Sequence, residues 1–278
     1  MSKTIPVRLD VIRTEQVGPS MRRVILGGDG FDTYWERHQA LPGYTDTYVK
    51  LLFWPDDFDV PEHVDLSQIA PEYRPTMRTY TIRSVDAEAR EIAIDFVVHT
   101  GIGDDGIAAP WALNARPGDS IHVRGPNGGY APDHTADWHL FVGDEAALPA
   151  ISAAIEALDP GDRGIAFIEV DGPADEVVFD TAGDVEVHWL HRGEAPRGST
   201  TLLDDAVRAW DWWPGRAQAF VHGESALLKS VRPYVLTDRG VDRADVSVSA
   251  YWRRGETEEG FRTWKSQQVE AVMRPTAR

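Results

Sequence analysis

The sequence predicts two domains, an antiparallel β-barrel followed by an α/β domain built on a parallel sheet. The chain of 278 residues exceeds one average domain. Its first half consists of short strand-like runs separated by turns, with almost no helix, whereas its second half alternates strands with helices. The change falls near Pro132-Asp133-His134. We therefore expect a barrel at residues 1–133, a parallel-sheet domain at 134–254 and a charged helical tail at 255–278.

The strands of the first half are marked by β-branched and aromatic residues between Gly, Pro and Asp. In the run from Thr47 to Trp54, Val49 and Leu51 share one face and Lys50 lies on the other. A brief helix is expected from Ala108 to Ala115. The other predicted strands are Val7 to Arg13, Met21 to Leu26, Arg78 to Arg83, Glu91 to His99 and Ser120 to Arg124.

The second half shows apolar residues at helical spacing between apolar strands, for example Leu148, Ile151 and Ile155. This alternation predicts a parallel sheet covered on both faces. The expected helices are Ala146 to Leu158, Thr200 to Trp210 with Ser199 as its cap, and Ser225 to Thr237. The expected strands are Trp138 to Val142, Gly164 to Val170, Val185 to Leu190, Ala217 to His222 and Asp245 to Tyr251.

Three loops follow strands of this predicted sheet: Gly143-Asp144-Glu145, His191-Arg192-Gly193 and His222-Gly223-Glu224. Open parallel sheets bind ligands at the carboxyl ends of their strands. The three loops share that edge, so the pattern predicts a nucleotide cleft there.

Composition excludes several classes of function. A net charge of −17 argues against nucleic acid or an anionic membrane as the main partner, because that field repels phosphate. The absence of cysteine removes disulfides, iron–sulfur clusters and zinc–thiolate sites, so redox chemistry would need an organic cofactor or a metal held by His and carboxylates. No apolar signal core or membrane-length stretch is present, so we expect a cytoplasmic protein.

Other local motifs are less informative. Gly101-x-Gly103-x-x-Gly106 matches a dinucleotide fingerprint, but Asp104 inside it would repel a pyrophosphate. Gly223-Glu224-Ser225 lacks the second glycine of a hydrolase nucleophile elbow. His188 and His191 would point to opposite faces of a strand, which disfavours a shared metal ion.

The segment Arg78-Thr79-Tyr80-Thr81 resembles the flavin-binding motif of ferredoxin-reductase-like enzymes. In such a motif the tyrosine ring packs on the flavin, the hydroxyls bond its edge and the arginine neutralises phosphate. Eight further blocks occur in order: Asp95-Phe96-Val97-Val98-His99, Ala108-Ala109-Pro110-Trp111-Ala112, Arg116-Pro117-Gly118-Asp119, Arg124-Gly125-Pro126, Gly143-Asp144-Glu145-Ala146-Ala147-Leu148-Pro149-Ala150, Trp189-Leu190-His191-Arg192-Gly193, Gly223-Glu224-Ser225 and Ser249-Ala250-Tyr251-Trp252-Arg253-Arg254-Gly255. Together they resemble the siderophore-interacting protein family of FAD-dependent ferric-siderophore reductases.

The resemblance implies a ferredoxin-reductase-like fold, an FAD-binding barrel and an NAD(P)H-binding α/β domain. The implied FAD contacts are Arg78, Thr79, Tyr80, Thr81, His99, Gly106, Ala108, Ala109, Trp111 and Ala112. The implied contacts with the donor are Gly143, Asp144, Glu145, Arg192, Gly223, Glu224, Tyr251 and Trp252. Arg192 would face the nucleotide phosphates and favours NADPH, since a 2′-phosphate suits a bidentate cation, although NADH stays open.

The same resemblance implies an anionic ferric siderophore as substrate, reduced to release ferrous iron in the cytoplasm. Its chelator already saturates the iron, so we expect no metal site built by protein ligands and no catalytic side chain. A basic pocket would hold the complex, with Lys50, Arg262 and Lys265 as candidates. We expect a monomer. Two alternatives stay open: another flavin-dependent NAD(P)H reductase of the same fold, or a non-enzymatic siderophore carrier.

Overall fold

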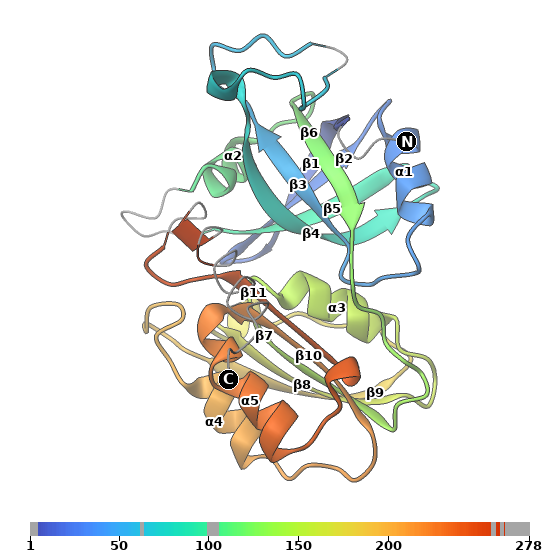
Figure 1. Cartoon of the computed structure of the whole chain (residues 1–278), viewed down its shortest axis with the longest axis vertical. Coiled ribbons are helices and arrows are strands. Elements are labelled where there is room, and N and C mark those ends of the chain that lie inside the picture. Colours follow the sequence, from blue (N-terminus) through green and yellow to red (C-terminus); the bar gives the residue numbers. More distant parts are fainter. Residues whose placement is uncertain (1–4, 62–63, 99–105, 257–259, 262–263, 265–278) are drawn as a thin grey trace, which may run out of the picture.

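The structure is a computed structural model that describes residues 5–61, 64–98, 106–256, 260–261 and 264. It confirms the predicted fold class, because a closed antiparallel barrel is joined to a five-stranded parallel sheet (Figure 1). Among these described residues, no helix combines the length and apolar character that crossing a bilayer requires.

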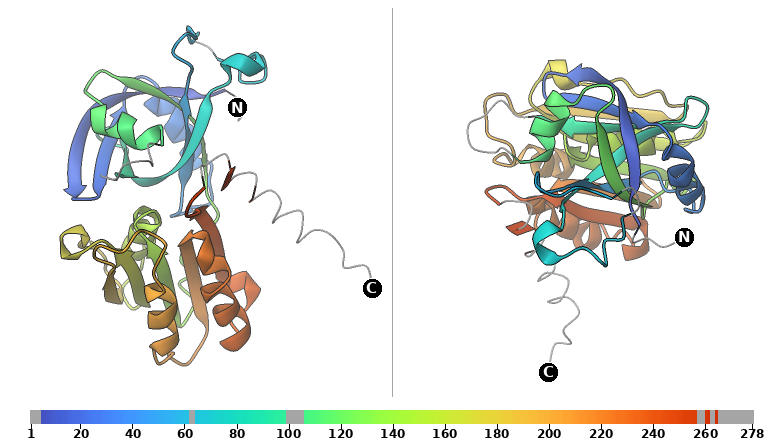
Figure 2. Two further views of the ribbon diagram at one scale, coloured as in Figure 1. Left: turned by 90° about the vertical axis from the view of Figure 1, so that its left-hand side faces the viewer. Right: turned by 90° about the horizontal axis from the view of Figure 1, so that it is seen from above.

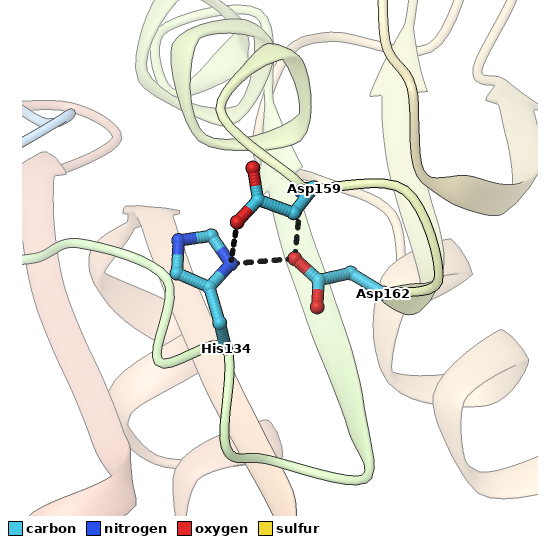
Figure 3. Close-up of side chains that lie close together, drawn as sticks. All are labelled: His134, Asp159 and Asp162. Atoms are coloured by element: carbon cyan, nitrogen blue, oxygen red, sulfur yellow. Dashed lines mark hydrogen bonds and ion pairs between the residues drawn. The ribbon is translucent and has the colours of Figure 1, made fainter.

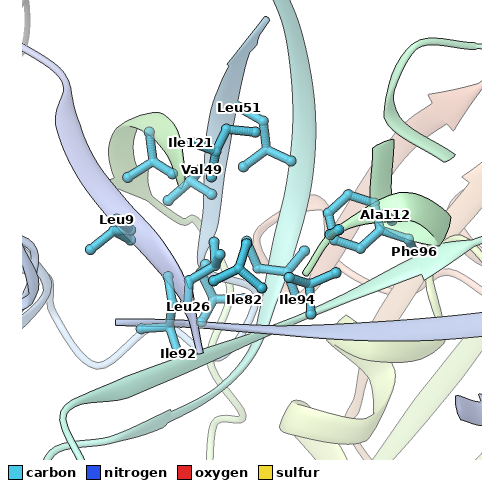
Figure 4. Packing of buried hydrophobic residues seen from close by; sticks show 14 of the residues in the cluster. Leu9, Leu26, Val49, Leu51, Ile82, Ile92, Ile94, Phe96, Ala112 and Ile121 are labelled. Carbon is cyan, nitrogen blue, oxygen red and sulfur yellow. The ribbon is translucent and has the colours of Figure 1, made fainter. Parts of the chain in front are cut away.

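The barrel has the strand order β1-β2-β5-β4-β3-β6 and is closed by antiparallel pairing of β1 with β6. Leu9, Leu26, Leu51 and Ile94 are fully buried in its core (Figure 4). Truncating such a side chain to alanine costs about 2–5 kcal/mol. The elements of this domain are β1 (Val7–Gly18), β2 (Met21–Gly27), α1 (Phe31–Gln39), β3 (Tyr48–Phe53), β4 (Thr76–Asp86), β5 (Glu91–Val97), α2 (Ala108–Asn114) and β6 (Ser120–Asn127), with a 3₁₀ turn at Pro71–Tyr73.

The parallel sheet has the order β11-β10-β7-β8-β9. Helix α3 lies between this sheet and the barrel, while α4 and α5 cover the opposite face (Figure 1). The elements are β7 (Trp138–Asp144), α3 (Leu148–Glu156), β8 (Arg163–Val170), β9 (Asp184–His191), α4 (Leu202–Ala209), β10 (Ala217–Glu224), α5 (Val231–Pro233) and β11 (Val246–Trp252), with short 3₁₀ turns at Pro173–Asp175, Ser225–Leu228 and Arg243–Asp245.

The expectation of almost no helix in the first half was incomplete, because it missed α1. Phe31 and Tyr34 lie one turn apart and are buried against the barrel core. The rest of this nine-residue helix is polar or aromatic, which gives a short apolar face and a composition that also suits strands.

Two helix predictions in the second half were wrong in detail. The stretch from Ser225 to Thr237 is broken into a 3₁₀ turn, the single turn α5 and a π-helical turn at Tyr234–Asp238. Pro233 lies within it and has no N–H to donate to the preceding turn. Ser199 does not cap α4, which begins after Thr201; the Ser199 hydroxyl instead donates to the carbonyl of Pro196.

The two domains appear as separate lobes that meet along one face (Figure 2), and polar side chains join them there. Arg83 in β4 donates both guanidinium arms to Glu156 in α3, at 2.6 and 2.7 Å. A second link joins Asp175, in the 3₁₀ turn after β8, to the barrel, because this carboxylate accepts hydrogen bonds from the backbone N–H and hydroxyl of Ser20. The barrel strand β4 is therefore fixed against the first helix of the α/β domain.

Candidate functional site

Strand β4 changes its pairing partner halfway along its length. Residues Thr76–Thr81 pair with β3, and residues Ile82–Asp86 pair with β5. Beside the first half of β4, helix α2 packs on β2 and β5. Four aromatic side chains are in ring contact along this part of the barrel wall, Phe53, Tyr80, Phe96 and Trp111, with the Tyr80 and Phe96 ring centroids 4.4 Å apart.

The residues of this wall fit the chemistry of a flavin. Tyr80 is half-buried, and Arg78 on the same strand face is half-buried with Nη1 3.2 Å from the carbonyl of Met77. No side chain at the N-cap position of helix α2 accepts a hydrogen bond from the first N–H groups of the helix. An aromatic wall, a guanidinium and helix N–H groups suit a planar ring with an attached pyrophosphate.

The other predicted flavin contacts lie in different surroundings. Ala108 and Ala112 are buried in the barrel core, so only their backbone could face a cofactor. Gly106 borders open space, since a Cβ added there would meet no atom within 4 Å. His99 lies outside the described residues. The role of each in flavin binding stays a prediction.

In the α/β domain, Asp144 connects loops at the carboxyl ends of β7, β10 and β11. Its Oδ1 accepts from the backbone N–H of Ala146 at 2.9 Å. Its Oδ2 accepts from the N–H of Glu224 at 2.9 Å and from Trp252 Nε1 at 2.7 Å. Burial raises the pKa of the Asp144 carboxyl, and the nearby Arg197 guanidinium opposes the shift. Asp144 thus holds together residues that the sequence predicts to bind the donor.

Two glycines allow the loops around Asp144 to approach one another closely. A Cβ on Gly143 would lie 2.7 Å from both the Ala147 Cβ and the His222 carbonyl oxygen. Gly223 has φ +139°, and a Cβ there would lie 2.9 Å from the Asp144 carboxyl. Both positions require glycine for steric reasons.

Glu145 and Arg192, also predicted to contact the donor, form a buried ion pair. Arg192 Nη2 contacts both Glu145 and Asp171, and its Nη1 lies 3.7 Å from Glu169. Only 1% of the Arg192 side chain is exposed. Burial also raises the pKa of Glu169. A phosphate could reach this guanidinium only if it left these carboxylates.

The two halves of the site meet where Tyr251 of β11 hydrogen-bonds the Thr81 side chain of β4. The Tyr251 ring also stands edge-on to His222, 5.1 Å between centroids. Burial raises the pKa of the Tyr251 hydroxyl, and the nearby Asp46 adds to the shift. A predicted flavin contact is therefore joined directly to a predicted donor contact.

Arg124, a basic residue that the sequence did not predict as part of the substrate pocket, lies beside Lys50. On the outer barrel face Lys50 is in register with Thr79 of β4 on one side and with Arg124 of β6 on the other. Only the pairing of β3 with β6 could have revealed Arg124. The other two substrate candidates, Arg262 and Lys265, lie outside the described residues.

Within the described part of the chain, His134, Asp159 and Asp162 place potential metal-ligand atoms within 4.8 Å of one another (Figure 3). His134 Nδ1 lies 2.6 Å from Asp162 and 3.6 Å from Asp159. Asp162 also accepts from the Asp159 N–H. These groups satisfy one another at the amino end of β8, away from the loops around Asp144.

A barrel joined to a parallel sheet of this order defines the ferredoxin-reductase-like class of fold. A ferredoxin reductase of carbazole 1,9a-dioxygenase has the same fold at 15% identity, with a TM-score of 0.59 over 89% of this chain and 70% of that one. The siderophore-interacting FAD-binding domain model matches residues 10–130, and the siderophore-interacting protein model matches residues 136–255. The chain belongs to the siderophore-interacting protein family.

Relatives cover nearly the whole chain. An uncharacterised protein of Mycobacterium tuberculosis is 47% identical over 94% of this chain and 95% of its own. Ferric vibriobactin reductase of Vibrio cholerae is 30% identical over 94% of both chains. An NADPH-dependent ferric-chelate reductase of Escherichia coli is 37% identical over 88% and 91%. The crystal structure of a siderophore utilization protein from T. fusca is 35% identical, with a TM-score of 0.76 over 91% and 95%.

Proposed function

We propose that this protein is an NAD(P)H-dependent, FAD-containing reductase of ferric siderophores, acting in the cytoplasm to release ferrous iron. Membership of the family and the ferric reductases among its relatives support this proposal. When bound, a flavin supplies the step between a two-electron donor and one-electron acceptors. One NAD(P)H would thus reduce two ferric ions and release one proton.

The contact between Thr81 and Tyr251 is the observation that carries the proposal. Thr81 lies on the strand that holds Arg78 and Tyr80. Tyr251 lies near the carboxyl end of β11, next to Trp252, whose Nε1 donates to Asp144. The side chains of Arg78 and Tyr80 lie on the other face of β4 from Thr81, so the contact would bring a donor on the sheet edge close to a flavin held by this strand. Electron transfer between them needs such proximity.

The basic pair on the outer barrel face, Lys50 and Arg124, would hold the substrate beside this contact. Lys50 pairs with Thr79, two residues before Thr81 on the same strand face. Lys50 and Arg124 would attract an anionic chelate locally despite the net charge of −17. The chelator keeps its iron ligands, so the protein need only hold the complex and exclude competing acceptors.

An anaerobic assay with NADH, NADPH and a panel of ferric chelates tests this function. We expect a yellow preparation with bound FAD, bleaching by a nicotinamide donor, and reoxidation by an anionic ferric siderophore. Trapping the ferrous product with a chromogenic chelator should give two irons per donor. Reoxidation by quinones or free flavin alone would contradict the proposal in favour of another reductase. A colourless protein that binds ferric siderophore without flavin would point to a carrier.

A further inference from the structure

Arg192 is turned into the protein rather than toward the nucleotide edge. Its guanidinium contacts the carboxylates of Glu145 and Asp171, and its side chain is 1% exposed. Its Nε and Nη1 are buried without a hydrogen-bond acceptor among the described residues. These donors are enclosed by the protein, so an anion could reach the guanidinium only if Nη2 left its two carboxylates, which would leave buried charges unpaired.

Asp171 is the carboxylate of this network that a ligand can reach. Its side chain is 48% exposed, whereas those of Glu145 and Glu169 are 1% and 6% exposed. It follows Val170, the last residue of β8, the strand next to β7 in the sheet. In doubly wound sheets of this order, a carboxylate at the end of the second strand accepts hydrogen bonds from the adenosine ribose of NAD.

The local charge also disfavours a phosphate on that ribose. Around Arg192 lie three carboxylates, those of Glu145, Glu169 and Asp171. The next cation, Arg197, already contacts Glu145 at 3.4 Å and lies 4.9 Å over the Trp252 ring. A 2′-phosphate placed beside Asp171 would meet a surplus of negative charge in a partly buried site, where screening is weak.

We propose that Asp171 selects NADH over NADPH by accepting hydrogen bonds from the adenosine ribose, and that Arg192 is a positioning residue that fixes Asp171. This inference rests on the proposed use of a nicotinamide donor. Under this proposal Arg192 does not bind the nucleotide phosphates, as the sequence resemblance implied, but holds the Asp171 carboxylate in place. Because a hydrogen bond to a charged group is involved, we expect a preference of about tenfold or more.

Isothermal titration of the FAD-loaded protein with NAD⁺ and NADP⁺ tests the proposal directly. The wild type should bind NAD⁺ at least about tenfold more tightly. Asp171→Asn should weaken NAD⁺ binding and bring the two dissociation constants within about threefold. Asp211→Asn is the matched control, since it makes the same charge change on an exposed carboxylate between α4 and β10, at the amino end of β10. It should leave the ratio unchanged.

Arg192→Lys separates the two roles of that residue. A positioning residue predicts weaker NAD⁺ binding with no specific loss for NADP⁺, whereas a phosphate ligand predicts a larger loss for NADP⁺. The adenosine fragments 5′-AMP and 2′,5′-ADP should repeat the wild-type preference. Equal or tighter binding of NADP⁺ by the wild type, or an unchanged ratio in Asp171→Asn, would overturn the inference. Failure to bind either dinucleotide would overturn the proposed function itself.

Discussion

Tyr251 and Thr81 are joined by a hydrogen bond across the boundary between the two domains. Tyr251 lies in β11, an edge strand of the parallel sheet, and Thr81 lies in β4 of the barrel. Arg83, two residues after Thr81, is tied to Glu156 of α3, so the same barrel strand is held at two neighbouring points. The geometry between the aromatic wall of the barrel and the sheet edge therefore depends on a few specific polar contacts.

Tyr251→Phe should remove the contact while keeping the ring against His222. We expect a loss of about 0.5–1.5 kcal/mol in the free energy of unfolding, the ordinary net contribution of one hydrogen bond. Reduction of the flavin by the donor should also slow. A double-mutant cycle with Thr81→Val, followed by urea unfolding, measures the coupling; fully additive losses would show that the hydrogen bond contributes nothing.

Asp144→Asn should disorganise the donor edge. The carboxylate accepts from Glu224 N and Trp252 Nε1, and an amide cannot accept from all of its present donors at once. We expect a loss of about 1–3 kcal/mol in stability and weaker donor binding. Trp252 should move, so intrinsic fluorescence provides a readout independent of turnover. Asp180→Asn, on an exposed carboxylate, serves as the control; similar behaviour of the two variants would count against the role of Asp144.

Arg78→Ala should lose FAD. If the guanidinium faces the pyrophosphate, its removal costs about 1.5–3 kcal/mol of binding, which corresponds to about 10–150-fold in the dissociation constant. Arg74→Ala is a matched control, because Arg74 is exposed in the loop before β4. Absorbance of the protein after dialysis reports the retained flavin, and full retention by Arg78→Ala would argue strongly against the proposed contact.

Lys50→Ala and Arg124→Ala should weaken an anionic ferric chelate while leaving flavin reduction by the donor unchanged. The same is expected of Lys265→Ala, whose position lies outside the described residues. The loss should shrink as salt rises, since screening removes the attraction that the variants lack. Stopped flow separates the two half-reactions, with Lys229→Ala, an exposed lysine near α5, as control. Unchanged reoxidation at low salt in both barrel variants would leave Lys50 and Arg124 as surface charges.

Stability should depend on pH through two histidines whose pKa values are shifted in opposite directions by folding. The hydrogen bond to Asp162 raises the pKa of His134, so its stabilisation is complete below pH 6.5 and is lost as the pH rises through the raised value. Burial lowers the pKa of His139, so its contribution is present above pH 6.5 and is lost as the pH falls toward the lowered value. Urea midpoints across pH should therefore fall less steeply at alkaline pH in His134→Gln and less steeply at acid pH in His139→Gln. Identical pH profiles for both variants and the wild type would refute this assignment.

Much of the fold could be predicted because its determinants are local. Alternation in β3 places Val49 and Leu51 in the barrel core and Lys50 outside, as expected from strand geometry alone. Helical spacing identified α3, and the run from Arg78 to Thr81 was correctly predicted as a strand, while its role in flavin binding stays a prediction. Where local signals conflicted with tertiary packing, as for α1 and for the segment around Pro233, prediction failed.

The surroundings of the site residues were decided only by the tertiary structure. The sequence determined that Arg192 follows a strand of the parallel sheet, but its burial depends on carboxylates from two other loops, those of Glu145 and Asp171. Likewise, Lys50 acquires Arg124 as a neighbour only through the register of β3 with β6. Periodicity along a chain specifies which face a side chain occupies, whereas its charge environment arises from residues far away in sequence that folding brings within a few ångströms.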